Sequence, residues 1–286
     1  MSGEGATRPE IRTATIDDLA AIREILIAHG NDGPVVVADI VGPYLVHLIG
    51  RGGARVALLG EEIVGFGAAI DTGRSVHLAD LFVRPDRLGQ GIGRPLLASA
   101  LDGATVRTTF ASEDPRALPL YVRAGMQPLW ASLYVQGPSA ALPLVPALRT
   151  ETAAPARLAA LEREWTGAER SGDHAFWGTM PAGDAFVVLE RDTVQAFGYA
   201  RVRQAAPIRV LDRLVIHPDA DPVAATLVAL ARAGRGGPVL TCLLGPHPVL
   251  RSLLEAGFRI VDRDQFLTSE PDLVDPARLI PNPGML

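Results

Sequence analysis

The stretch that decides the fold reads HLADLFVRPDRLGQGIGRPLL and covers residues 77–97. It opens as a strand, which ends before a proline because the missing N–H stops a β-ladder. Gly89, Gly91 and Gly93 follow, and without Cβ atoms they let the backbone turn sharply toward a ligand. The helix expected from Arg94 to Leu101 adds unpaired amides and the positive end of its dipole. Strand, turn and helix together predict a pyrophosphate site.

Two other phosphate-binding motifs do not fit this stretch. No Gly-Lys-Ser/Thr follows it, as a nucleoside triphosphate site requires, and its strand is the fourth expected along the chain, whereas a dinucleotide fold places the glycine turn after its first strand. A glycine turn by itself is also compatible with an ordinary strand-to-helix connection. The surrounding pattern has to decide between these readings.

Strand and helix signals alternate around the glycine turn, which favours an α/β arrangement. Thr15 and Asp18 form a helix-start signal. The expected elements of the first half are strands at 11–14, 55–59, 63–71, 76–83, 105–111 and 126–135 and helices at 16–29, 94–101 and 117–124. We therefore expect an α/β fold in which helices flank a sheet.

The segment from Val83 to Gly93 has the spacing Val-x-Pro-x-x-x-Gly-x-Gly-Ile-Gly. It resembles the acetyl-CoA-binding motif of the GNAT superfamily of N-acetyltransferases. This resemblance implies a mixed, mostly antiparallel sheet flanked by helices. The family often has Arg or Gln directly before the first glycine, where this chain has Leu88, with Arg87 one residue earlier. This departure removes a side-chain contact and leaves the amides. The resemblance implies that the pantetheine and thioester are lined by Leu81, Phe82 and Val83, and that the pyrophosphate is held by Leu88, Gly89, Gln90, Gly91, Ile92, Gly93 and Arg94.

A second element of the same family lies between Asp114 and Met126. It is similar to the pattern Asn-x-x-Ala-x-x-x-Tyr-x-x-x-Gly-Phe, with Asp114 for Asn and Met126 for Phe. The resemblance implies that Tyr121 protonates the departing CoA thiolate, and an uncharged phenol is a suitable donor. The alternative is that Tyr121 only packs its ring on an apolar helix face.

Transfer to an ammonium substrate also requires a group that removes a proton. His77 and Asp80 on the expected cofactor strand are the candidates, and Glu113 is a third. Bases of the family often occupy the position of His77. Strand alternation puts residues 77 and 80 on opposite faces unless a bulge intervenes, so we expect only one of them to face the substrate. The alternative for each is a structural hydrogen bond at a strand end.

The second half of the chain repeats the first. Residues 63–67, 81–85 and 124–126 resemble residues 194–198, 214–218 and 256–258, at separations of 131, 133 and 132 residues. Matches in one order at a nearly constant separation indicate a duplicated domain. We expect a catalytic GNAT domain over residues 1–136, a proline-containing linker over 137–147 and a degenerate GNAT-like domain with a tail over 148–286.

The second copy lacks the chemistry of the first. Its turn contains Asp219 and Asp221 and no glycine, and aspartates repel a pyrophosphate. Leu253 stands at the position of Tyr121. We expect this copy to cover the substrate cleft or to dimerise. Its polar-aromatic cluster either lines a substrate pocket or belongs to a surface loop with a buried tryptophan; the cluster comprises Asp173, His174 and Trp177.

Composition excludes several other classes of protein. A net charge of -5 and a pI near 5.7 give no basic surface for nucleic acid. The apolar run from Pro34 to Ile49 is interrupted by polar residues and predicts no membrane span. A single cysteine and a polar start are typical of a cytoplasmic protein, and the use of arginine with no lysine suggests a bacterial source. Scattered histidines predict no metal site.

These observations favour an acetyl-CoA-dependent N-acetyltransferase. We expect an acetyl group to move to a primary amine of a small molecule or peptide by direct attack in a ternary complex. An acidic net charge mildly favours a cationic amine, and a homodimer is the default oligomer. One alternative is a non-catalytic acyl-CoA-binding or sensing protein of the same fold. Another is a purely structural pair of domains that binds no CoA.

Overall fold

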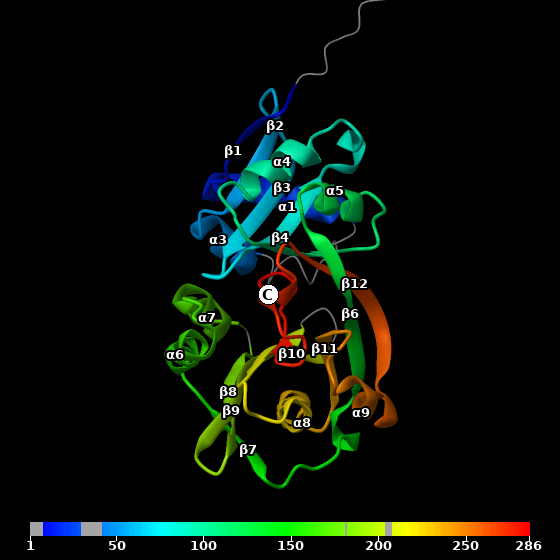
Figure 1. Ribbon diagram of the computed structural model, residues 1–286. Helices are drawn as coiled ribbons and strands as arrows, with labels where there is room; N and C mark the ends of the chain where they lie inside the picture. The colour runs from blue at the N-terminus through cyan, green and yellow to red at the C-terminus, as the bar shows by residue number, and fades with distance from the viewer. Residues whose placement is uncertain (1–7, 30–41, 181, 204–207) are drawn as a thin grey trace, which may run out of the picture. The chain divides into compact units, whose positions relative to one another are not determined.

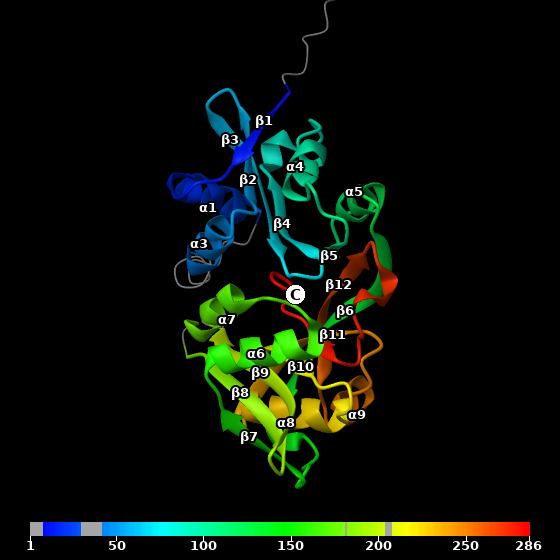
Figure 2. The same cartoon turned by 60° about the vertical axis from the view of Figure 1, so that its left-hand side comes forward.

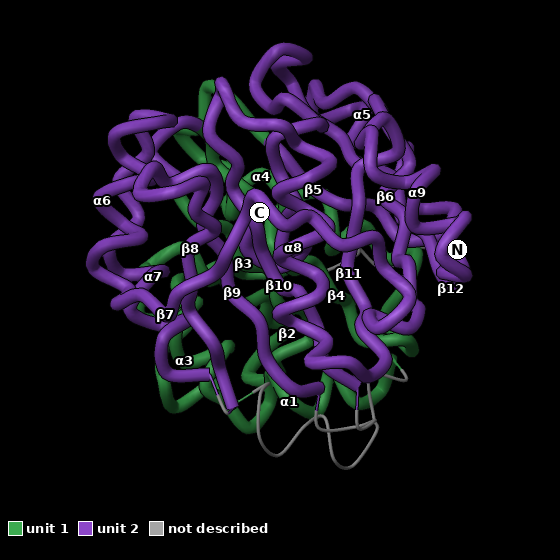
Figure 3. Tube along the Cα trace, turned by 90° about the horizontal axis from the view of Figure 1, so that it is seen from below, with its two compact units in different colours: residues 1–71, 75–107 green, residues 72–74, 108–286 purple. Residues whose placement is uncertain are grey.

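The structure is a computed structural model that describes residues 8–29, 42–180, 182–203 and 208–286 (Figure 1). The chain divides into two compact units, shown in green and purple in Figure 3. The first unit comprises residues 1–71 and 75–107, and the second comprises residues 72–74 and 108–286.

The first unit contains the antiparallel strand order β1-β2-β3-β4. Figure 2 shows helices α1 and α3 on one side of these strands and α4 on the other. The described elements of the unit are β1 (Glu10–Thr13), η1 (Ile16–Asp18), α1 (Leu19–Ala28), α3 (Gly42–Gly50), β2 (Ala54–Leu59), β3 (Glu62–Asp71), β4 (Val76–Val83), η3 (Pro85–Arg87) and α4 (Gly93–Ala100).

Local signals and observed elements agree well in this unit. Thr15 and Asp18 form the expected capping box, and the helix after them starts as the 3-10 turn η1 before it continues as α1. Helix α3 was not expected, because Gly42 and Pro43 interrupt the apolar pattern there. A proline is tolerated in the first turn of a helix, where its missing N–H has no partner to lose. The rest of the apolar run, residues 34–41, lies outside the described residues.

The second unit contains the strand order β5-β12-β6-β11-β10-β9-β8-β7, and β13 pairs with β10. Only the pairing of β10 with β11 is parallel among the described strands of this unit, so the sheet is mixed and mostly antiparallel as expected. Its elements are β5 (Arg107–Ala111), α5 (Ala117–Arg123), β6 (Gln127–Pro138), η4 (Ser139–Ala141), β7 (Leu148–Thr152), α6 (Pro155–Thr166), α7 (Ser171–Gly178), β8 (Asp184–Glu190), β9 (Thr193–Arg203), β10 (Ile208–Ile216), α8 (Pro222–Gly234), β11 (Pro238–Leu244), α9 (Leu250–Glu255), β12 (Arg259–Thr268), η5 (Pro271–Leu273) and β13 (Leu279–Ile280).

The order of elements confirms the duplication. The series β7, α6, α7, β8, β9, β10, α8, β11, α9, β12 repeats the series β1, α1, α3, β2, β3, β4, α4, β5, α5, β6. We call the elements β1 to β6 the first copy and β7 to β12 the second copy. The main apolar core of the second unit forms around α8, and none of the described helices is both long and apolar enough to cross a membrane.

The last strands of the two copies are interleaved. Strand β12 lies between β5 and β6, while β6 lies between β12 and β11. Each copy therefore places its last strand beside the fifth strand of the other. Strand β6 also runs to Pro138, and its last three residues pair with β11, so the strand extends into the segment expected as a linker. The domain boundaries themselves stay a prediction.

Candidate active site

The glycine turn presents bare backbone. After β4 and η3, Gly89 and Gly91 have φ angles of +80° and +81°, in the left-handed region that favours glycine. A Cβ atom at either position would meet no other atom within 4 Å. Helix α4 then begins at Gly93, and the preceding Ile92 makes no side-chain cap. Nothing from the described chain therefore covers this face of the turn.

The amides of the turn are free. Among the hydrogen bonds of the described residues, none uses a backbone N–H of residues 89–94, and the first bond of α4 runs from Leu96 N to Ile92 O at 3.3 Å. Unpaired amides at a helix start carry a partial positive charge. Arg94 is exposed at the same place and makes no ion pair with a described residue. The turn thus combines bare amides with a free guanidinium, a combination that suits phosphate oxygens.

The side chains just before the turn already have partners within the chain. Arg87 donates to the Glu62 carboxylate at 3.2 Å, and Arg84 pairs with both Glu62 and Asp86. Leu88 packs against the small apolar cluster under the turn. Leu88 therefore supports the turn by packing. Arg87 is held by Glu62, so it does not replace the Arg or Gln side chain that the family often has directly before the first glycine.

A β-bulge reverses the expected orientation of the two candidate bases. Leu78 lies opposite Ala69 and Asp80 lies opposite Ala68, so Ala79 is an extra residue in β4. Residues opposite each other on paired strands share a face. His77 lies opposite Ile70, two residues from Ala68, so His77 and Asp80 are on one face. Simple alternation gave opposite faces, and the bulge is the physical reason for the difference.

The surroundings of Asp80 distinguish it from His77. Tyr44 on α3 donates its hydroxyl hydrogen to the Asp80 carboxylate, while the second oxygen, Oδ2, is buried and has no partner among the described residues. Burial raises the pKa of Asp80 to about 6, although the bond from Tyr44 acts in the opposite direction. One oxygen is thus anchored by Tyr44, and the other has no hydrogen-bond partner, which is the sense in which we call it open. A carboxyl group of this kind, with a pKa near neutrality, suits a general base.

His77 and the end of β4 are more enclosed. His77 has no exposed surface. At the end of the strand, His29 Nε2 donates to the carbonyl oxygen of Val83 at 2.7 Å, and the His29 ring lies 5.4 Å from the Phe82 ring. Leu81 and Val83 pack instead with the cluster under α4. The three cofactor-strand residues therefore point their side chains to both faces of the sheet, and any contact common to all three involves their backbone.

Tyr121 and Glu113 belong to the second unit. Tyr121 lies on α5 with a buried side chain, and its carbonyl oxygen accepts from Ala124 N and Met126 N at 3.0 and 3.2 Å. Its catalytic role stays a prediction. Glu113 is exposed and pairs with Arg263 at 3.4 Å, which favours a surface ion pair for this residue.

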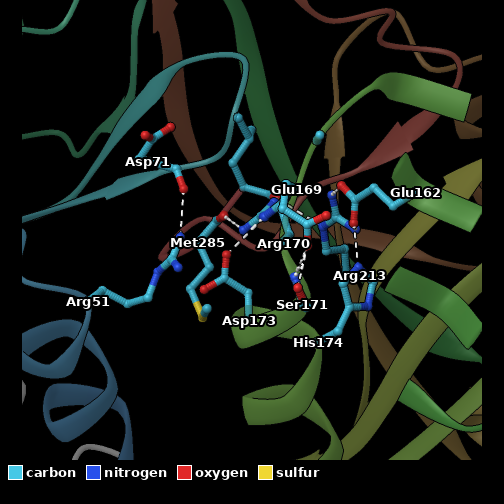
Figure 4. Close-up of polar contacts among 12 residues, drawn as sticks. Arg51, Asp71, Glu162, Glu169, Arg170, Ser171, Asp173, His174, Arg213 and Met285 are labelled. Carbon is cyan, nitrogen blue, oxygen red and sulfur yellow. Dashed lines mark hydrogen bonds and ion pairs between the residues drawn. The ribbon is translucent and has the colours of Figure 1, made fainter. Parts of the chain in front are cut away.

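In the second copy, the expected polar-aromatic cluster is buried and is no surface loop (Figure 4). His174 Nε2 lies 2.7 Å from Glu162, and its Nδ1 lies 2.8 Å from the hydroxyl of Tyr199. Arg213 donates two hydrogen bonds to Glu162, at 2.6 and 3.1 Å. Arg170 donates to Asp173 at 3.0 Å. Helices α6 and α7 and strand β10 thus close a network of paired charges.

The pKa shifts of this cluster indicate a structural role. Burial opposes ionisation of Glu162, but Arg213 and His174 outweigh it, so the pKa of Glu162 is lowered. Burial lowers the pKa of His174 despite its contact with Glu162. A neutral His174 then donates from Nε2 to the carboxylate and accepts from Tyr199 at Nδ1. This network resembles a satisfied buried ion pair more than a site open to substrate.

Sequence reasoning missed Tyr44, because it lies on the unexpected helix α3 and no motif marks it. No three His, Cys, Asp or Glu side chains gather to hold a metal ion within the ranges that the structure describes.

Comparison with known proteins shows what part of the chain is similar to a known family. Residues 50–127 match the family model of the acetyltransferase (GNAT) domain. This match contains β4, the glycine turn and all of α5. Residues 50–127 are therefore similar to a GNAT domain, and the whole chain has the tandem GNAT fold that its sequence predicts.

Solved structures of similar fold cover nearly the whole chain. A candidate acetyltransferase from Pyrococcus horikoshii has 16% identity and a TM-score of 0.75, over 98% of this chain and 95% of that one. A GCN5-related N-acetyltransferase from Anabaena variabilis has 14% identity and a TM-score of 0.64, over 91% and 72%. A tandem GNAT protein of the clavulanic acid biosynthesis pathway has 17% identity and a TM-score of 0.59, over 93% and 100%. None of the curated proteins matches the sequence.

Proposed function

We propose that the chain is an acetyl-CoA-dependent N-acetyltransferase that acetylates a primary amine of a small molecule or peptide. The observation that carries the proposal is that one strand, β4, serves two functions. Its end leads into the turn of free amides, and the bulge before that end positions Asp80 with one open carboxylate oxygen. Anion binding and proton removal would then be fixed relative to each other by a single strand.

The cofactor-holding residues fit a diphosphate. The N–H groups of residues 89–94 and the guanidinium of Arg94 are available to it, and the absence of a Cβ at Gly89 and Gly91 leaves room for close approach. Acetyl-CoA would supply the activated thioester carbonyl. The backbone of residues 81–83 would align the pantetheine arm along the strand.

Asp80 is proposed as the base because its Oδ2 is open while Tyr44 holds the other oxygen. It would take the proton from the ammonium form of the substrate, which frees the nitrogen lone pair for attack on the thioester. His77 lies on the same face but has no exposed surface, which favours a supporting role. Tyr121 is proposed to protonate the departing thiolate. No covalent enzyme intermediate is needed.

The decisive experiment compares two glycine variants. Gly91→Glu places a carboxylate in the turn, whereas Gly103→Glu makes the same change at another exposed glycine with a similar φ, +72°, and open space around it. We expect Gly91→Glu to weaken acetyl-CoA binding by at least about tenfold in calorimetry, and Gly103→Glu to leave it unchanged. Equal affinity in both variants would contradict the proposed site.

Turnover is tested separately from binding. A panel of small-molecule and peptide amines is incubated with acetyl-CoA, and release of free thiol is recorded. Thiol release with at least one amine, reduced in Tyr121→Phe, supports the enzyme. Acetyl-CoA binding without thiol release from any amine would favour a binding or sensing protein instead.

A further inference from the structure

The tail of the chain lies along β10. Strand β13 pairs antiparallel with Leu214 and Val215 of β10, and Ile216 N donates to the carbonyl oxygen of Arg278 at 3.0 Å. The parallel pairing of β10 with β11 covers only residues 209–211 of β10. Strand β13 therefore takes the edge of β10 beyond the point where pairing with β11 ends.

This edge is the counterpart of the proposed cofactor edge in the first copy. In β10, Asp212 is the extra residue of a bulge, and Arg213 lies opposite Tyr199. In β4, Ala79 is the extra residue, and Asp80 lies opposite Ala68. Counted from the two bulges, residues 214–216 correspond to residues 81–83, to which the GNAT resemblance assigns the pantetheine arm. The second copy thus holds a peptide strand at the equivalent place.

Side chains anchor the first half of the tail. The Arg278 guanidinium donates to the carbonyl oxygens of His217, at 3.1 Å, and of Ala220. These two residues belong to the turn that replaces the glycine turn. Ile280 is fully buried in the core around α8. The tail thus begins with a charged anchor and continues with an apolar one.

The second half of the tail is held at the bulge and by two arginines. Asn282 Nδ2 donates to Asp212 Oδ2 at 2.9 Å. Arg170 donates to the backbone oxygens of Met285, at 2.6 Å, and of Leu286, at 2.7 Å, and Arg213 donates to the Leu286 oxygen at 2.9 Å (Figure 4).

Arg170 and Arg213 together form a buried binding site for backbone oxygen atoms. Arg170 and Arg213 are only 2% and 4% exposed, and their guanidinium groups lie 4.9 and 5.0 Å from the centre of the Trp177 ring. Two buried cations that converge on one oxygen bind it more strongly than neutral donors do, and contact with an indole ring stabilises them further. The two arginines therefore favour an electron-rich oxygen at this end of the tail.

We propose that the edge of β10 beyond its pairing with β11 is a peptide-binding site whose occupant in this chain is its own segment 278–286. The site takes an extended peptide with an arginine at its start, a buried aliphatic residue two positions later, and a backbone oxygen between Arg170 and Arg213. Recognition follows the mode in which a peptide adds a strand to a sheet edge. The inference concerns the second copy alone and does not depend on the function proposed for the first.

The test uses the full-length protein with a protease site inserted between Pro271 and Asp272, which are both exposed. The folded protein is cut, and a fluorescent synthetic peptide of residues 272–286 is added in excess. We expect fluorescence anisotropy to show uptake by the cut protein. The uncut protein should take up none, because its attached tail competes at a very high effective concentration.

Variants of the peptide then test the recognition without changing the protein. Ile280→Asp should weaken binding by about a hundredfold or more, because it buries a charge. Arg278→Ala should weaken it by about tenfold, and the exposed Asp272→Ala serves as the unchanged control. The proposal is overturned if cut protein that keeps its circular dichroism takes up no peptide, or if the Ile280→Asp peptide binds as tightly as the original.

Discussion

The two copies of the chain share the same order of strands and helices, but their helix starts differ in whether the backbone amides have hydrogen-bond partners. Both place a bulge in the same strand, at Ala79 in β4 and at Asp212 in β10. After β4, the helix start is left with free amides. After β10, the Asp221 side chain accepts from Val223 N and Ala224 N, at 2.9 and 3.3 Å. Buried or clustered backbone donors need partners, so the second copy supplies from its own sequence what the first leaves for a ligand.

The residues after the two bulges show the same contrast. Asp80 keeps one carboxylate oxygen open, whereas Arg213 is paired with Glu162 and with the Leu286 oxygen. A polar group without an internal partner costs folding free energy and is retained where it has a function. Polar groups without a partner therefore mark the candidate site in the first copy. The fully paired network indicates a structural role for the corresponding residues of the second copy.

The largest expected effect comes from breaking the buried ion-pair network of the second copy. Glu162→Ala removes the partner of both Arg213 and His174 and should lower the free energy of unfolding by about 3–5 kcal/mol, the usual cost of leaving a buried charge unpaired. Urea unfolding of the variant and wild-type chains measures this loss. Glu164→Ala, which changes an exposed glutamate of the same helix α6, is the matched control and should barely move the midpoint. Similar midpoints for the two variants would mean that the network contributes little.

The next effect concerns the open carboxylate. Asp80→Asn should lower kcat/KM by about 10²–10⁴, and the wild-type rate should fall as the pH drops through about 6, the pKa of Asp80. Steady-state rates between pH 5 and 9 measure both. An Asp80→Asn enzyme with the wild-type pH profile would exclude Asp80 as the base.

Stability should respond to Asp80 in the opposite direction. Because the folded-state pKa of about 6 exceeds the usual value of 3.8, the folded protein binds more protons than the unfolded chain between these values. The carboxyl group therefore makes the protein less stable as the pH rises from about 4 to 6. Asp80→Asn should remove that decline from a series of thermal unfolding curves, and an unchanged decline would mean that another group causes it.

A smaller expected effect on the rate tests the role of Tyr44. Tyr44→Phe removes the hydrogen bond that lowers the pKa of Asp80, so the acidic limb of the rate profile should move to higher pH. We expect a rate loss of up to about tenfold near pH 6 and little loss at pH 8. An equal loss at both pH values would indicate that Tyr44 only supports the fold.

The smallest expected effect tests the self-capped helix of the second copy. Asp221→Ala removes the side-chain cap of α8 and should cost about 1 kcal/mol, measured by thermal unfolding. Asp219→Ala, a change of a neighbouring exposed aspartate that does not cap the helix, is the control. A larger loss in the control would show that the cap is not the stabilising feature of this turn.

The sequence predicted the parts of the molecule that depend on local signals. The proline after Val83, the three glycines and the capping box at Thr15 each act within a few residues, and the strand, turn and helix there were expected. The bulge at Ala79 was not, because an alanine in a strand gives no local sign of an extra residue. Its effect on the faces of His77 and Asp80 therefore required the pairing register.

Features formed by residues distant in the sequence were also missed. Glu162 and Arg213 are 51 residues apart, and Arg170 and Leu286 are 116 apart. Asp173, His174 and Trp177 were noticed as a group, but their burial follows from these distant partners. No local pattern predicts which charged residues will meet across a core. The tail strand β13 likewise pairs with β10, which is distant in the sequence.

The interleaving of β6 and β12 has a consequence for synthesis on the ribosome. Strand β5 ends at Ala111, but its partner β12 begins only at Arg259. At about 5–20 residues per second, β5 emerges on the order of ten seconds before the strand that completes its edge. During that interval its open backbone is exposed to other nascent chains. A halved gene would make that interval permanent, and each half would then tend to borrow the missing strand from a neighbour.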